Sequence, residues 1–387
     1  MRTMSPCYLD WAAGAPPYRD LIIEAADLAT RCYGNPSSMH SAGKSARTEL
    51  ENSRAGLATV IGTTAEHIIF TSGGTEADSI AMLSTLAGKS QRSVVISSIE
   101  HAAIFEQARI LEELGITIIR VAPDHDGFIN PEAVANAVRP DTAMVAVMAV
   151  NNETGAIQPI KRIVDSVRTA AGNAGRKPLF YCDAVQALGT IGFDVAGSGV
   201  DGAGFSAHKL GGPRGIGALY LRKPLRPLAI GGGQEGGIRP GTHNTPGAWA
   251  FAKAAARSAE TRVPAMARAR EFEKTLIDGL RRIPGATPIP VSRMAGDERY
   301  SPNIVHAAFP GLGGEVLCRL LDMQGIAVST GAACSSTRKE RRILDAMGVD
   351  RALSFSSIRI STGRDTTVAD INEFLDHVAT LHAHYRV

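Results

Sequence analysis

Lys209 is the residue of this sequence best placed to act as a reactive amine. It directly follows the apolar run 202–206 and is enclosed by the glycines at 211, 212 and 215. A lysine at the end of a buried strand loses part of the solvation that favours its ammonium form, so its pKa falls and its amine can form a Schiff base with an aldehyde. Taken alone, a lysine in a glycine-rich turn is more typical of a solvated loop position, because such lysines are common.

Asp183 ends a second apolar run, 179–183, twenty-six residues before Lys209. If both runs are parallel strands, their carboxyl ends present the two side chains on one rim of a sheet. A carboxylate that faces a pyridine nitrogen keeps that nitrogen protonated, which is the condition for pyridoxal phosphate to accept electrons. The pair therefore predicts a pyridoxal phosphate site.

Three further segments follow apolar runs and offer groups to such a cofactor. The segment 71–77 contains Gly74 and Thr75 at a strand-to-helix junction, where backbone N–H groups and the helix dipole attract a phosphate. His101 could stack on an aromatic ring and exchange protons near neutral pH. Asn152 offers an amide to a ring hydroxyl. Each segment read by itself is also compatible with an ordinary role, namely a helix N-cap, a surface histidine and an asparagine-rich turn.

Cys334 differs from the other cysteines in its surroundings. The five cysteines (Cys7, Cys32, Cys182, Cys318 and Cys334) are odd in number and form no CxxC pair, which argues against a disulfide framework and a zinc cluster. Cys334 lies among small residues in the segment 329–336, which predicts a mobile loop that exposes the thiol. The other four fit the common role of buried small hydrophobes.

The positions of these residues require an α/β fold. From residue 67 onward, short β-branched runs alternate with helical stretches, which predicts a mostly parallel sheet of about seven strands between helices. The run 215–221 follows Lys209 so closely that we expect it to turn back antiparallel. A helical stretch from 245 to about 280 connects to a smaller α+β unit. We expect a large domain over 15–260, and a small domain over 1–14 and 261–387 that carries the cysteine loop at about 325–340.

Charge and hydropathy exclude several classes of partner. Lys and Arg number 41 against 38 Asp and Glu, so no concentrated basic surface for nucleic acid is expected. The basic run 338–342 is interpreted as the solvated start of a helix. The longest apolar runs have only strand length, which predicts no membrane span. The first ten residues lack a signal-peptide pattern, so we expect a cytoplasmic protein.

The ordered set of motifs resembles the cysteine desulfurases, the class V aminotransferase branch of fold-type I pyridoxal phosphate enzymes. It includes the segments 8–13, 34–40 and 356–363 in addition to those above, and Cys334 resembles the thiol of the longer-loop group. The resemblance implies that Lys209 binds the cofactor covalently and that Cys334 receives sulfur from L-cysteine as a persulfide. It also implies a homodimer and a protein acceptor for the sulfur. The remaining roles that it implies are ring contacts for Asp183, Gln186, Asn152 and His101, phosphate contacts for Thr75, Ser206, His208 and, across the dimer, Thr242, and substrate carboxylate contacts for Asn35 and Arg359.

The expected activity is conversion of cysteine to alanine, with sulfur passing from Cys334 into iron–sulfur cluster assembly, tRNA thiolation or another thio-modification. Selenocysteine lyase and class V aminotransferase are alternatives on the same fold, and an inactive sulfur carrier or scaffold is an alternative of another class. Three positions depart from the pattern of the family: Trp11 where Asn or His is usual, Ser79 in place of Asn, and Gly236 in place of Arg. We expect these to affect the dimer interface or the rim of the cofactor site.

Overall fold

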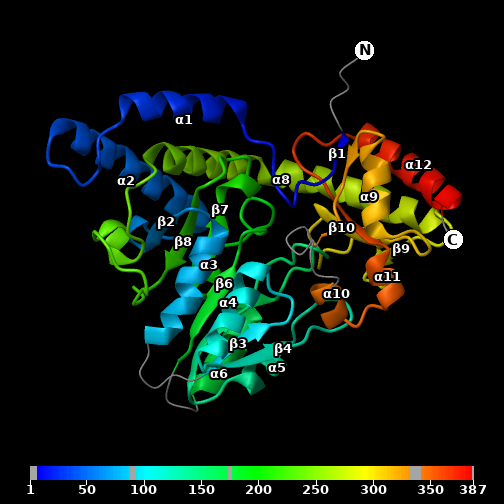
Figure 1. Ribbon diagram of the computed structural model, residues 1–387, viewed down its shortest axis with the longest axis horizontal. Coiled ribbons are helices and arrows are strands. Elements are labelled where there is room, and N and C mark those ends of the chain that lie inside the picture. The colour runs from blue at the N-terminus through cyan, green and yellow to red at the C-terminus, as the bar shows by residue number, and fades with distance from the viewer. Residues whose placement is uncertain (1–6, 88–92, 173–176, 332–340, 386–387) are drawn as a thin grey trace.

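The computed structural model describes residues 7–87, 93–172, 177–331 and 341–385, and Figure 1 shows a larger body of sheet and helices beside a smaller one. The core of the larger body is a seven-stranded sheet in the order β2-β8-β7-β6-β5-β3-β4. All its strands are parallel except β8, which runs antiparallel to both of its neighbours. The prediction of a mostly parallel sheet of seven strands is confirmed. The strands are β2 (Ile68–Thr71), β3 (Ser93–Ser97), β4 (Thr117–Val121), β5 (Thr142–Ala146), β6 (Leu179–Asp183), β7 (Gly202–Ser206) and β8 (Gly217–Leu221).

Helices cover both faces of this sheet because its strands are apolar on both sides. On β3, Val94 and Ile96 belong to an apolar cluster with residues of α3 (Gly74–Leu83) and α4 (Ala102–Glu113). Val95 between them belongs to a second cluster, which includes residues of α2 (Ser41–Ile61), α6 (Ile160–Gly172) and the start of α8 (Thr245–Arg282). This alternation follows from side chains that point to opposite faces of a strand. The helices of this body are α1 (Arg19–Arg31), α2 (Ser41–Ile61), α3 (Gly74–Leu83), α4 (Ala102–Glu113), α5 (Pro131–Ala137), α6 (Ile160–Gly172) and α7 (Val195–Ser198).

The helix α8 (Thr245–Arg282) joins the two bodies without interruption, although it contains Pro264. Its first half packs on the large sheet, and its second half contributes Phe272 and Leu276 to a separate apolar cluster with Val305, Ile358 and other residues of the small body. The domain boundary that we expect near residue 260 therefore falls inside one helix, and we retain that division as a proposal.

The small body is α+β. Its three-stranded antiparallel sheet has the order β12-β10-β9, and the amino-terminal strand β1 pairs in parallel with β11. Its strands are β1 (Cys7–Tyr8), β9 (Thr287–Ile289), β10 (Ile304–Ala308), β11 (Ile326–Ala327) and β12 (Ser357–Ser361). Its helices are α9 (Gly314–Asp322), α10 (Arg342–Ala346), α11 (Arg351–Phe355) and α12 (Val368–Tyr385). Short 3-10 helices complete the chain at η1 (Ala65–His67), η2 (Ser84–Ala87), η3 (Ala207–Lys209) and η4 (Gln234–Gly237).

The topology places the carboxyl ends of β2, β3, β5, β6 and β7 along one edge of the large sheet, because these strands are mutually parallel. The segments that follow them are the ones expected to carry the chemistry. No helix among the described residues combines the length and the apolar character that crossing a bilayer requires.

Candidate active site

One pocket at this edge of the sheet, about 610 Å³ in volume, brings together most of the residues singled out in the sequence. Its size is in the range of cofactor and ligand sites. Residues from β12 and from the start of α10 close its other side, so the pocket lies between the two bodies. The expected residues that line it are Gly74, Thr75, His101, Asn152, Asp183, Gln186, Ser206, His208, Lys209 and Arg359.

Lys209 lies at the end of η3, directly after β7, and its amine is held by backbone carbonyls. Its Nζ donates to the carbonyl oxygens of Ala12, at 2.5 Å, and Ala13, at 2.9 Å. These two carbonyls belong to the segment after β1, so the amino terminus of the chain reaches across to position the lysine. The two carbonyl oxygens fix the direction in which the amine points.

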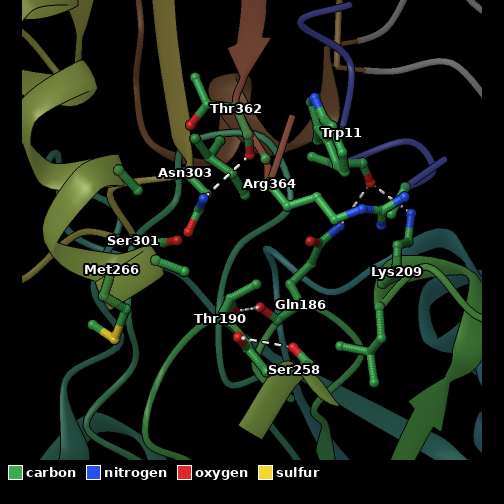
Figure 2. A pocket seen from close by; sticks show the side chains of 18 of the residues that line it. Trp11, Gln186, Thr190, Lys209, Ser258, Met266, Ser301, Asn303, Thr362 and Arg364 are labelled. Atoms are coloured by element: carbon green, nitrogen blue, oxygen red, sulfur yellow. Dashed lines mark hydrogen bonds between the residues drawn. The ribbon is translucent and has the colours of Figure 1, made fainter. Parts of the chain in front are cut away.

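Figure 2 shows a second, smaller cavity that shares Lys209 and Gln186 with the main pocket. Trp11 lies at its upper edge, where a Cβ on Gly363 would come within 2.0 Å of the indole Cδ2. The Arg364 guanidinium lies 5.3 Å from the indole centroid. Trp11 therefore packs at the rim of the lysine site. Ser79 and Gly236 are the other two positions that depart from the pattern of the family. Ser79 Oγ donates to the carbonyl oxygen of Thr75 at 2.8 Å, and Gly236 has a φ of 63°.

Asp183 is the last residue of β6 and is buried. Its Oδ1 accepts the backbone N–H of Val185 at 2.9 Å. Burial raises the pKa of Asp183, while the charges of His101 and Lys209 and the Val185 hydrogen bond act in the opposite direction. The neighbouring Asp78 accepts the Tyr181 hydroxyl at 2.8 Å, and burial followed by the charge of Asp183 raises the pKa of Asp78 well above its ordinary value. Burial and the charge of Asp183 thus both disfavour the ionised form of Asp78.

His101 is the N-cap of α4, and this role fixes its ring. Its Nδ1 accepts the backbone N–H of Ala103 at 3.2 Å, so the proton of the neutral ring is on Nε2. Burial lowers the pKa of His101, Asp183 raises it, and the charges of Lys209, Arg342 and Arg359 lower it further. Burial therefore favours the neutral ring, the nearby Asp183 favours the imidazolium, and Nε2 is the position that can exchange a proton.

A cradle for a phosphate lies at the amino terminus of α3. Gly74 must be glycine because a Cβ there would meet Val185 Cγ2 at 2.5 Å. Thr75 follows at the first turn, where the free N–H groups of the helix favour an anion. Ser206 Oγ and His208 Nδ1 lie 2.7 Å apart beside it, and burial, followed by the charges of Lys209 and Arg214, lowers the pKa of His208 to about 4. The cradle thus offers neutral hydroxyl and imidazole groups.

Asn152 and Gln186 provide amides in the lining of the pocket. Gln186 Nε2 donates to the carbonyl oxygen of Ala12 at 2.9 Å. The buried Oδ1 of Asn152 has no hydrogen-bond partner within the part of the chain that the structure describes. An orphaned buried acceptor in a polar pocket indicates that a ligand supplies the missing donor.

Arg359 lies on β12 and is 2% exposed. Its Nη2 contacts Asp10 Oδ1 at 2.8 Å and Ser329 Oγ at 3.0 Å, and its Nη1 donates to the backbone carbonyl of Asn152 at 2.8 Å. Its Nε is buried and has no hydrogen-bond partner among the described residues. A guanidinium with donor capacity left over in a pocket suits a carboxylate.

Two of the expected residues that the structure describes do not line this pocket. Asn35 and Thr242 are both exposed, and Asn35 Oδ1 accepts the backbone N–H of Ser37 at 2.9 Å. In the single chain both therefore lie outside this pocket. Cys334 lies outside the described residues, although Gly331 and Arg342 on either side of its segment both line the pocket.

The interpretation of the run 338–342 as a solvated helix start is wrong for Arg341 and Arg342. Arg341 is 7% exposed, and Arg342 lines the pocket with its guanidinium carbon 4.0 Å from the centroid of Phe105. The buried acids Asp78 and Glu153, which also line the pocket, were not singled out in the sequence either. Each is flanked by ordinary helix or turn residues, so no local pattern marks them.

Several known proteins are similar to this chain in sequence and in fold. The family model described as aminotransferase class-V matches residues 7–374. A cysteine desulfurase from Bradyrhizobium diazoefficiens is 37% identical over 375 residues, which cover 95% of this chain and 92% of that protein. The solved structure of a NifS-like protein superposes with a TM-score of 0.89 at 33% identity and covers 98% of this chain and all of that one. A structure titled SspA in complex with cysteine matches at 28% identity and a TM-score of 0.77, over 92% of this chain and 98% of that chain.

Proposed function

The chain belongs to the class V aminotransferase family, and from this membership and the geometry of the pocket we propose that it is a pyridoxal phosphate-dependent cysteine desulfurase. It converts L-cysteine to L-alanine and transfers the sulfur to Cys334. The observation that carries the proposal is that Lys209, Asp183 and Arg359 line one pocket. Gly331 and Arg342, which lie on either side of the segment that contains Cys334, line the same pocket. The relatives named as cysteine desulfurases across nearly the whole chain support it.

The donor set of the pocket fits pyridoxal phosphate. Gly74, Thr75, Ser206 and His208 would hold its phosphate, Asp183 would face the ring nitrogen, and the orphaned amide oxygen of Asn152 would face a ring substituent. His101 would lie against the ring. When bound, the cofactor supplies an electron sink for the carbon next to the substrate amine.

Three residues of the chain bind the substrate and move its protons. Arg359 binds the substrate carboxylate, because it is the guanidinium of the pocket with an orphaned buried donor, Nε. Lys209 removes the Cα proton with its amine nitrogen and returns it during product formation. His101 can exchange a proton with the substrate thiol only through Nε2, because its Nδ1 caps α4.

The sulfur step balances without an external oxidant or reductant. Cys334 loses its proton and attacks the sulfur of cysteine as a thiolate, so that one S–S bond forms while the C–S bond of the substrate breaks. The electron pair of that bond stays on the β-carbon, which takes up a proton and becomes the methyl group of alanine. The sulfur is oxidised, the carbon is reduced, and Cys334 carries a persulfide for a protein acceptor.

We also infer a homodimer. Thr242 and Asn35 are exposed in the single chain, and the resemblance to the family places both at an active site. A second copy that brings Thr242 to the phosphate cradle of its neighbour would complete the site.

Product analysis tests the proposed function. The protein reconstituted with pyridoxal phosphate should form alanine and reduced sulfur from cysteine when no keto acid is present, and Lys209→Ala should form neither. Alanine formation that requires a keto acid would instead identify an aminotransferase. A rate with selenocysteine that exceeds the cysteine rate by orders of magnitude would identify a selenocysteine lyase.

A further inference from the structure

Arg342 is the first residue of α10 and reaches into the pocket from the small body. Its Nη1 donates to the carbonyl oxygen of Ser98 at 2.6 Å, and its Nη2 donates to the carbonyl oxygen of Glu100. Its guanidinium lies over the Phe105 ring on α4. All three contacts are made to the segment that contains His101.

The Arg342 guanidinium is half-buried between these contacts. Among the described residues no carboxylate forms an ion pair with it, although Glu153, Glu100 and Glu106 are near enough to influence its pKa. Taking a charge partly out of water without an ion-pair partner has a cost in free energy. Carbonyl oxygens and an aromatic face offset part of that cost, and the arrangement indicates a role beyond the start of a surface helix.

The described residues on both sides of the segment that contains Cys334 are held by hydrogen bonds at the pocket. On the amino-terminal side, Ser329 and Arg359 exchange backbone hydrogen bonds. On the carboxyl-terminal side, Arg342 binds the segment before His101. Arg341 joins the two ends, because its Nη1 donates to the carbonyl oxygen of Thr330 at 2.8 Å. The chain therefore enters this segment beside Arg359 and leaves it beside His101.

We propose that Arg342 is a positioning residue for sulfur transfer, an inference that rests on the proposed function. Arg342 fixes the carboxyl-terminal end of the segment that contains Cys334 against the segment after β3 that contains His101. Cys334 is eight residues before Arg342, so this contact sets where the nucleophile's segment is anchored relative to the substrate sulfur. Binding of cysteine and removal of its Cα proton do not need the contact, because they use Arg359 and Lys209.

The chemistry of the contact requires arginine. The carbonyls of Ser98 and Glu100 are two residues apart, and a planar guanidinium can donate to both while its face stacks on Phe105. Lysine has a point charge on a flexible stem and cannot make both hydrogen bonds and the stacking contact together. Arg342→Lys therefore keeps the charge and removes the anchor.

The test separates early steps from sulfur transfer in the reconstituted full-length protein. For Arg342→Lys and Arg342→Gln, exchange of the cysteine Cα hydrogen with deuterated water and the KM for cysteine should stay within about twofold of the parent. The rate of sulfur loading on Cys334, measured by mass spectrometry of its peptide after rapid quenching, and kcat should fall by about tenfold or more, as small displacements of reacting groups do.

Arg120→Gln is the matched control. The Arg120 guanidinium also lies near the Phe105 ring, at 5.3 Å, but it pairs with Glu112 and does not line the pocket. This variant should load sulfur at the parent rate. Parent-like loading in both Arg342 variants would overturn the inference, and so would a parallel fall of exchange and loading, which would mark a general structural role. If the parent itself exchanges the hydrogen but never loads sulfur, the proposed function fails instead.

Discussion

Glu235 should contribute several kcal/mol to stability through its ionised form. Its side chain is 2% exposed and accepts four hydrogen bonds: two from Arg54, at 2.6 and 2.9 Å, one from the backbone N–H of Phe70 at 2.8 Å, and one from His243 Nε2 at 3.1 Å. It is also the one described residue other than glycine with a positive φ, 49°. The network fixes the turn that leads to Thr242.

The magnitude follows from the pKa of Glu235. Burial by itself would raise this pKa, but the hydrogen bonds from His243 and Arg54 and the charge of Arg54 outweigh burial and lower it from 4.5 to about 2. At about 1.4 kcal/mol for each pKa unit, the difference amounts to about 3 kcal/mol at pH 7. Because the folded-state pKa is the lower one, this stability is fully present above pH 4.5 and is lost as the pH falls toward 2.

Glu235→Gln tests this value, and Glu51→Gln is the control because Glu51 contacts the same Arg54 at 3.1 Å from a 53% exposed position. Urea unfolding followed by tryptophan fluorescence should show a loss of about 3 kcal/mol for Glu235→Gln at pH 7 and less than about 1 kcal/mol for Glu51→Gln. The difference between Glu235→Gln and the parent should shrink between pH 5 and pH 3. Equal losses for the two variants, or a Glu235→Gln loss that does not change with pH, would refute the reasoning.

Three other substitutions have defined outcomes. Lys209→Ala should abolish turnover and the visible absorbance of the reconstituted protein, because the pocket then lacks the amine held by the carbonyls of Ala12 and Ala13. Asp183→Asn should lower kcat by orders of magnitude while some cofactor stays bound, since a neutral amide does not hold a proton on the ring nitrogen, and near-parent turnover would contradict that role. Gly363→Ala should destabilise the fold by about 1 to 3 kcal/mol, because its Cβ would lie 2.0 Å from Trp11 Cδ2. In thermal unfolding, Gly172→Ala, whose Cβ would meet nothing within 4 Å, should lose no stability.

Patterns local in the sequence predicted the large sheet well. The apolar runs that end at Asp183 and Ser206 are strands, and the run after Lys209 turns back as β8, because a short connection cannot cross over to a parallel strand. No prediction was made for α1 and α2. Their first turns lack the usual signals, since Tyr18 makes no side-chain cap for α1 and the cap of α2 is His40.

The site residues were predictable where a side chain that can react or titrate lies at or just after the end of a strand, as for Lys209, Asp183 and His101. It was not predictable where the partner is distant in sequence. Arg342 is part of a run of charges that is typical of a solvated helix. Its contacts are with Ser98, which directly follows β3, and with Phe105 on α4, both far earlier in the chain. Only the packing of the small body against the large one creates that environment.

The central claim is that sulfur from cysteine is carried by Cys334, and the mass of the Cys334 peptide tests it most directly. After incubation of the reconstituted protein with cysteine, this peptide should gain one sulfur atom, about 32 Da, that a thiol reductant removes. Cys334→Ser should still exchange the Cα hydrogen of cysteine but should almost stop releasing alanine. Alanine release by Cys334→Ser at the parent rate, or the added mass on Cys182 or Cys318 instead, would contradict the account.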